Sequence, residues 1–344
     1  MAAIFLSVFF GLLAVVFPWW LGIGLFVAPV VFFIAGRYPL FGLILTMFFL
    51  FNVIPERFIP QIPFVGGKLK IHDLLIIFLS GVVFFRYLVQ RQSIRDLLGP
   101  AFWPLIYVLA CIALGTVYGR LVLHQEFAIS EARNHIGWLI MPLLALCVDT
   151  PQRFKILLRA LLFAAIVIAI YVVIQSTFDI NIMGGRVEML DVRENADVTR
   201  STAGGGVYLI IFALLYFLGM AQTRRMTWWL VLPVVVVLLA GLAVTFGRGV
   251  WVATAAGLLV ASFLQRGFLH GVVVAVAGTI LLSVLLAGVS LVNPRVVEVM
   301  VDRATGIKEE IKSGGSFHDR QIENAAAIKM IQTKPWFGTG LGGA

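Results

Sequence analysis

Stretches of about 20 consecutive apolar residues recur along most of this chain, and they leave it few ways to fold. A helix of that length spans the hydrocarbon core of a bilayer and satisfies its backbone hydrogen-bonding groups within its own segment. Hydrophobic residues make up 61% of the 344 residues, charged residues make up 12%, and the mean hydropathy is +1.01. The apolar runs are continuous rather than alternating, which argues against a β-barrel. The sequence therefore predicts an all-α, polytopic transmembrane helical bundle.

We expect about 11 spans within residues 1–292, separated by short loops and by two longer ones, residues 55–70 and 179–202. The expected spans lie near residues 2–17, 20–35, 38–53, 72–87, 98–118, 135–147, 160–177, 204–223, 227–246, 249–266 and 268–292. Residues 293–344 form a polar tail. Apolar residues at helical spacing predict two amphipathic helices there, one over 295–311 and one that begins near Ser316.

The basic residues are distributed unequally between the two sets of loops. With a cytoplasmic N-terminus, the loops on that side carry 10 basic residues and two acids, and the other side carries 16 basic residues and 15 acids. Short cytoplasmic loops are enriched in Lys and Arg, so this orientation is the favoured one. The 10 residues are Arg37, Arg86, Arg91, Arg95, Arg153, Lys155, Arg159, Arg224, Arg225 and Arg266. An odd number of spans then places the tail outside, on the same face as Arg200 and Arg248.

Arg248 stands alone between two apolar runs, with Gly247 and Gly249 on either side. A charged side chain near hydrocarbon depth costs several kcal/mol on insertion scales, so it usually faces a cavity or a partner. Two interpretations stay open. Arg248 belongs either to a tight Gly-Arg-Gly turn whose arginine extends to the interface, or to a site that binds an anion.

Several arginines on one outer face favour binding of an anionic headgroup. Guanidinium is a permanently charged, planar fork of donors that suits phosphate. A lipid-linked pyrophosphate needs both such a clamp and an apolar groove. Arg200 directly precedes a span that opens with three glycines, whereas Arg186 and Arg193 are weaker candidates. Both lie in a loop rich in acids with which they can form exposed pairs.

Three stretches carry a family resemblance. They are Thr199–Gly204, Val244–Trp251 and Arg320–Gly342, with Asp73-Leu74-Leu75 as weaker support. The second is similar to a Thr-x-Ser-Arg-Gly turn with Gly247 in place of serine, and the third ends in a Pro-x-Phe-Gly-x-Gly-x-Gly-like turn. Together they resemble the O-antigen ligase and O-antigen polymerase family of bacterial inner-membrane proteins.

The resemblance implies metal-independent, inverting glycan transfer without a cofactor, at the periplasmic face of the inner membrane. The donor would be a glycan on undecaprenyl pyrophosphate, and the acceptor a lipopolysaccharide core sugar or another glycan. Arg200 and Arg248 would stabilise the charge on the leaving pyrophosphate, with Arg320 as a weaker substrate-binding candidate.

Members of this family carry an acceptor-activating histidine beyond the glycine-rich turn, in a large periplasmic loop. Here no histidine follows that turn before Ala344, so we expect the chain to be incomplete at its C-terminus. His318 precedes the turn and does not inherit the role. The general base stays open, with Glu126, Glu131 and His135 as unranked candidates.

Three other functions remain as alternatives. A flippase or carrier for polyprenol-linked glycans would need the arginines to face a cavity that opens to either side. A peptidoglycan-type polymerase would rely on an outer aspartate, for which Asp191 and Asp197 are available. A structural scaffold would leave Arg248 unexplained.

Cys111 and Cys147 lie inside apolar runs and indicate neither a disulfide framework nor a metal site. The net charge of +9 follows from the basic residues of the loops and does not indicate binding of nucleic acid.

Overall fold

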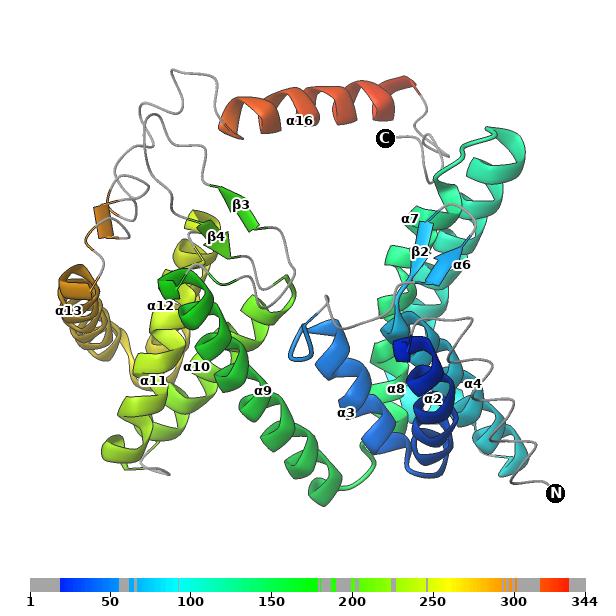
Figure 1. Ribbon diagram of the computed structural model, residues 1–344, viewed down its shortest axis with the longest axis horizontal. Coiled ribbons are helices and arrows are strands. Elements are labelled where there is room, and N and C mark those ends of the chain that lie inside the picture. The colour runs from blue at the N-terminus through cyan, green and yellow to red at the C-terminus, as the bar shows by residue number, and fades with distance from the viewer. Residues whose placement is uncertain are drawn as a thin grey trace. The chain divides into compact units, whose positions relative to one another are not determined.

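The computed structural model describes most of the chain as helix (Figure 1). It describes residues 19–55, 62–64, 67–91, 93–178, 180, 187–189, 199–201, 204–223, 227–245, 247–292, 294, 297–298, 301 and 316–333. The chain divides into two compact units. The first comprises residues 1–47 and 61–157, and the second comprises residues 48–60 and 158–344.

The first unit is built from short and medium helices with one small hairpin. Its elements are α2 (Trp19–Arg37), α3 (Pro39–Leu50, whose last residues belong to the second unit), β1 (Ile62–Phe64), β2 (Gly67–Leu69), α4 (Ile71–Val89), α5 (Ile94–Leu98), η2 (Gly99–Ala101), α6 (Phe102–Val117), the π-turn η3 (Tyr118–Val122), α7 (Ala128–Asn134), η4 (Ile136–Leu139) and α8 (Ile140–Cys147).

Helix α4 lies at the centre of the first unit and packs against α2, η4 and α8. Its buried face carries apolar residues at helical spacing: Leu75, Ile76, Leu79 and Val83. The Tyr87 hydroxyl donates a hydrogen bond of 3.0 Å to the Leu146 carbonyl oxygen, which joins the end of α4 to α8.

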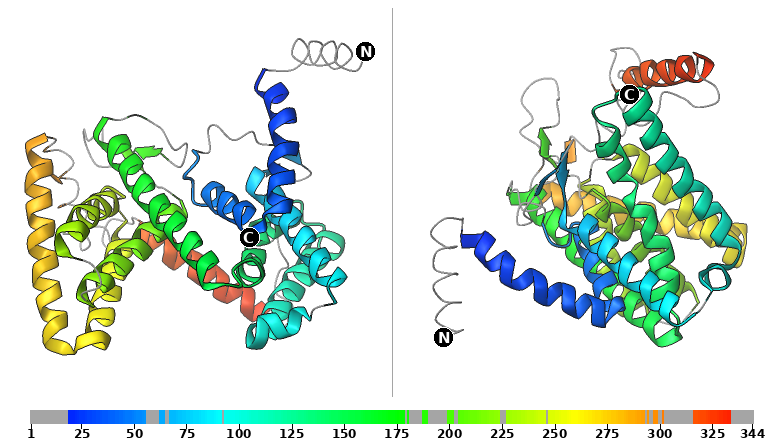
Figure 2. Two further views of the ribbon diagram at one scale, coloured as in Figure 1. Left: turned by 90° about the horizontal axis from the view of Figure 1, so that it is seen from below. Right: turned by 90° about the vertical axis from the view of Figure 1, so that its right-hand side faces the viewer.

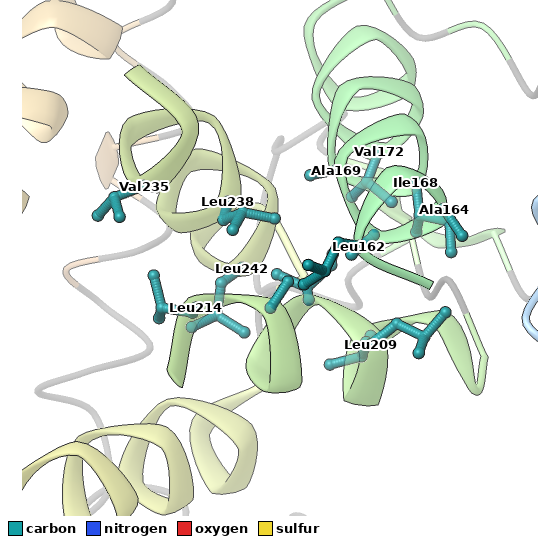
Figure 3. Close-up of a cluster of buried hydrophobic side chains, with 14 of the residues drawn as sticks. Leu162, Ala164, Ile168, Ala169, Val172, Leu209, Leu214, Val235, Leu238 and Leu242 are labelled. Atoms are coloured by element: carbon teal, nitrogen blue, oxygen red, sulfur yellow. The ribbon is translucent and has the colours of Figure 1, made fainter. Parts of the chain in front are cut away.

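The second unit is held by close apolar packing of α9 (Pro151–Phe178), α10 (Gly206–Gln222) and α11 (Trp228–Ala243). The labelled side chains of Figure 3 come from these three helices and form one buried cluster. On α9 the buried residues of this cluster lie on one face at helical spacing: Leu162, Ala164, Ala165, Ile168, Ala169 and Val172. Small residues on this face let the neighbouring backbones approach closely, as is common between membrane helices.

Two glycines show how close this approach is. A Cβ at Gly241 of α11 would lie 2.7 Å from the Ala169 Cβ and 2.8 Å from its Cα. A Cβ at Gly206, the first residue of α10, would lie 2.8 Å from the Phe51 carbonyl oxygen. Neither position has room for a larger residue unless a helix moves.

Helices α12 (Arg248–Arg266) and α13 (Phe268–Val292) pack against each other along the chain's next hairpin, seen in yellow and gold in the left view of Figure 2. Gly267 between them has φ +85°, a left-handed conformation that glycine adopts without strain. The unit also contains β3 (Val187–Met189), β4 (Thr199–Ser201) and α16 (Ser316–Thr333).

Within the part of the chain that the structure describes, three helical segments are long and apolar enough to cross a membrane. They are Ile71–Val89, Ile94–Val122 and Pro151–Phe178. Further apolar helices of 10–17 residues also occur. The helical class and its membrane character are therefore as expected, while the number of 11 spans stays a prediction. The helix expected from near Ser316 is confirmed as α16. The first expected span and most of the helix expected over 295–311 lie outside the described residues.

The structure differs from the expectation in the loops and in one span. Strands β1 and β2 pair antiparallel within the expected loop 55–70, and β3 and β4 pair within the loop 179–202. The expected sixth span is broken into η4 and an eight-residue α8. Pro142 is tolerated there because it lies in the first turn of α8, where its missing N–H has no intrahelical acceptor.

Candidate functional site

The turn between α11 and α12 is buried and closely hydrogen-bonded. The Thr245 hydroxyl donates to the Leu242 carbonyl oxygen at 2.7 Å, and the Trp251 indole N–H donates to the same oxygen at 2.9 Å. Carbonyl groups in the last turn of a helix lack intrahelical partners, so these two bonds satisfy one of them. Because Trp251 belongs to α12 and Leu242 to α11, the bonds fix the start of one helix to the end of the other.

Gly247 is buried and precedes α12 in an extended conformation, with φ −90° and ψ 94°. Its carbonyl oxygen accepts the backbone N–H of Trp251 at 3.0 Å. A Cβ at this position would lie 3.1 Å from Cγ2 of Val250, which is tighter than an ordinary contact. A glycine therefore suits this crowded position of the turn.

Arg248 is the first residue of α12, so the interpretation that places it within a Gly-Arg-Gly turn is wrong in the position of that turn. The turn ends at Gly247, and Arg248 and Gly249 are helical, because the bonds to Leu242 and Gly247 start the helix at that point. The first N–H groups of a helix have no intrahelical acceptor, and the helix dipole makes this end positive. An arginine at the same place adds a full charge to an end that already favours anions.

Arg200 is the central residue of β4, and its Cα partner in the antiparallel register is Glu188 of β3. Opposite charges at directly opposed positions of two strands contribute about 0.2–1 kcal/mol. Arg200 thus has an acidic cross-strand neighbour within the chain. The sequence alone does not show this register, because it depends on how the loop folds back on itself.

The other expected site residues are less well defined. Arg186, Arg193, Asp191 and Asp197 lie outside the described residues, and Arg320 and His318 lie on α16. Their roles stay predictions. Arg200 and Arg248 both belong to the second unit. Arg200 lies in β4, before α10, and Arg248 is the first residue of α12.

The first unit contains a polar cluster around a buried carboxylate that sequence reasoning did not assign. Asp73 is only 6% exposed. Its Oδ2 accepts the backbone N–H of Lys70 at 3.1 Å and lies 3.8 Å from Nε of Arg133, and its Oδ1 lies 3.6 Å from Nε2 of His72. The carboxylate therefore caps the first turn of α4 and pairs with a cation from α7.

The cluster has a mainly structural character. A buried carboxylate requires hydrogen bonds and a counter-charge to remain ionised at low cost. Arg133 provides the charge and the N-cap backbone provides a donor, so α7 is fixed to the start of α4. The available sequence signal was the acid at the start of a span. Its partner 60 residues later could not be identified from spacing.

The general-base candidates all come from the neighbourhood of α7. Glu131 and His135 are partly buried and Glu126 is exposed. The general base stays open among these three residues. Among the residues that the structure describes, no group of three or more His, Cys, Asp or Glu side chains is arranged to hold a metal ion.

Comparison with known proteins yields no match, whether to a protein-family model, to a curated protein or to a solved structure.

Proposed function

We propose that this protein transfers or polymerises a glycan from an undecaprenyl-pyrophosphate donor at the outer face of the bacterial cytoplasmic membrane. The acceptor is a lipopolysaccharide core sugar or another glycan. The proposal takes the chain as a multi-pass protein of about 11 spans with a cytoplasmic N-terminus, as its loop charges favour. The reaction type follows from the resemblance to the O-antigen ligase and polymerase family.

One observation carries the proposal, namely the position of Arg248 at the N-terminus of α12 behind a buried, hydrogen-bonded turn. Residues 198–297 contain six arginines and no acid, so the sequence around Arg248 offers it no local counter-charge. A pyrophosphate leaving group develops negative charge as the glycosidic bond breaks. A preorganised cation and helix N-terminus stabilise that charge without reorganisation at the moment of reaction.

In this mechanism Arg248 binds the diphosphate and stabilises its charge as it leaves the anomeric carbon. The acceptor hydroxyl attacks from the opposite face of the sugar, which gives inversion, and it loses its proton to a base that is not assigned. Arg200 lies directly opposite Glu188 in the register of β3 and β4, so an acidic neighbour competes with the substrate for it. We therefore rank Arg248 above Arg200.

The test is glycan transfer in vitro by the protein expressed from its complete coding sequence, with an undecaprenyl-pyrophosphate oligosaccharide as donor. Arg248→Ala is expected to lower the rate by about 10²–10³-fold, the usual effect of removing one such charge-stabilising donor. Arg266→Ala removes the same charge from the other end of the same helix and is the matched control. We expect it to transfer at the wild-type rate.

Two results would reject the proposal. One is wild-type transfer by Arg248→Ala protein that is folded and present in the membrane. The other is movement of the lipid-linked glycan across vesicles without any covalent product, which would favour the flippase alternative.

A further inference from the structure

A groove lies between α2 and α4 at the opposite end of α4 from Asp73. It has a volume of about 780 Å³ and is open to the surroundings. Its lining consists of Gly36, Arg37, Ile77, Phe78, Gly81, Val82, Phe85 and Arg86. Both helices belong to the first unit, so the groove is formed within one compact part of the chain.

Glycine keeps the groove open. A Cβ at Gly81 would meet no atom within 4 Å, so the space above this part of α4 is empty. A Cβ at Gly36 would touch the Phe78 ring at 3.4 Å. That ring packs edge-on against Phe32 of α2, with centroids 4.8 Å apart, and so forms a firm apolar wall.

Two arginines flank the groove, each in the last turn of its helix. Arg37 ends α2 and Arg86 lies near the end of α4, and both are exposed. Among the described residues neither has a carboxylate within 4.0 Å, and the sequence contains no acid before Glu56. The helix C-termini favour cations, which explains each arginine alone but not their convergence on one apolar groove.

Two neighbouring arginines provide a contrast. Arg153 forms an ion pair with Asp149 at 2.8 Å, and the guanidinium of Arg95 lies 5.7 Å from the centroid of the Trp103 ring. Arg153 and Arg95 are thus already engaged by groups of the protein, unlike the two arginines at the groove.

We propose that this groove binds an anionic phospholipid, with the headgroup phosphate held by Arg37 and Arg86. The acyl chain lies on the apolar walls formed by Ile77, Phe78 and Phe85. Basic pockets between membrane helices on the cytoplasmic side bind anionic headgroups, and the attraction of guanidinium for phosphate is strengthened by paired donors. A free phosphate ion would leave most of the lining unused. This inference is independent of the proposed glycan transfer.

The experiment is native mass spectrometry of the full chain in detergent, titrated with phosphatidylglycerol or with phosphatidylcholine. The wild-type chain should bind phosphatidylglycerol at least tenfold more tightly than phosphatidylcholine. Arg37→Gln/Arg86→Gln should weaken phosphatidylglycerol binding about 25-fold, at roughly fivefold for each arginine. Arg153→Gln/Arg159→Gln removes the same charge from the same predicted side and should leave the affinity unchanged.

A second variant tests the apolar part without changing any charge. Gly81→Leu fills the empty space above α4 and raises its helix propensity, so the protein should fold and its lipid affinity should fall about tenfold. Equal loss of binding in the two double-arginine variants would overturn the proposal, as would full competition by inorganic phosphate. A dimer mass that Gly81→Leu abolishes would assign the groove to a second copy of the chain and overturn it as well.

Discussion

The two units of this protein surround one important charged residue with different neighbours. In the first unit, the buried Asp73 has Arg133 as a counter-charge and the Lys70 backbone as a donor, and α7 is held to α4 by this cluster. In the second unit, residues 204–292 include four arginines and no acid, and the core is formed by small apolar residues in close contact. Asp73 is thus paired within its own unit, whereas the sequence around Arg248 supplies no acid.

This difference separates structural from functional charge. Removing a cation that stabilises its own fold lowers the free energy of unfolding, because the buried partner of that cation is left uncompensated. A cation that awaits a ligand can be removed at little cost to stability but at a large cost to function. The comparison can therefore be tested by stability measurements alone, through the substitutions below.

The largest effect is expected from Asp73→Ala. It removes the cap of α4 and leaves Arg133 without its counter-charge, and the cost in free energy of unfolding should be about 3 kcal/mol. The measurement is an SDS titration in mixed micelles, followed by far-UV circular dichroism. Asp96→Ala, at an exposed acid of α5, is the matched control and should cost less than about 0.5 kcal/mol.

A double-mutant cycle extends this prediction. If Asp73 and Arg133 are coupled, Asp73→Ala should cost about 1–2 kcal/mol less when Arg133 is already alanine. Strictly additive costs would mean that Asp73 acts only as a helix cap. The first unit would then not depend on the pairing of Asp73 with Arg133.

The next effect is expected from Gly241→Ala. The added Cβ would lie 2.7 Å from the Ala169 Cβ, so α9 and α11 must separate, at a cost of about 2 kcal/mol. Gly278→Ala adds the same atom to α13, where nothing lies within 4 Å, and should stabilise the protein by about 0.5–1 kcal/mol through helix propensity. The same SDS titration should give opposite signs for the two variants. The same sign for both would show that close packing does not hold the second unit.

Much of the helical layout could be predicted from the sequence because apolar runs determine it. The expected span 268–292 coincides with α13, and the expected span 72–87 lies within α4. The prediction of a continuous helix failed where polar residues and proline interrupt the apolar pattern. The expected sixth span is broken there into η4 and α8. The two hairpins were missed because three-residue strands leave too short a period-2 pattern to detect.

The candidate site was predictable only in part. The glycines beside Arg248 marked a helix boundary, but whether the arginine precedes or begins the helix depends on the bonds that Thr245 and Trp251 make to Leu242. The pairing of Asp73 with Arg133 and the register of Arg200 with Glu188 depend on tertiary folding. No local spacing rule contains that information.

A smaller effect is expected from Trp251→Phe. The ring is retained, but the indole N–H no longer reaches the Leu242 carbonyl, so the free energy of unfolding should fall by about 1 kcal/mol. Trp229→Phe, at an indole that is 85% exposed on α11, should change it by less than about 0.5 kcal/mol. Equal values for both variants would mean that the turn before α12 is not fixed by this bond.

The smallest effects are expected from Arg248→Gln and Arg153→Gln, each within about 0.5 kcal/mol in the same titration. Arg153 is paired with Asp149, but the two side chains are 44% and 47% exposed, so solvent screens most of the gain. Arg248→Gln should change the free energy of unfolding just as little, but for another reason. The sequence around Arg248 supplies no acid, so the substitution breaks no ion pair with a neighbour in sequence. A loss near that of Asp73→Ala would instead reveal an internal acidic partner. Arg248 would then be a structural cation like Arg133, and the contrast between the two units, with the function built on it, would be lost.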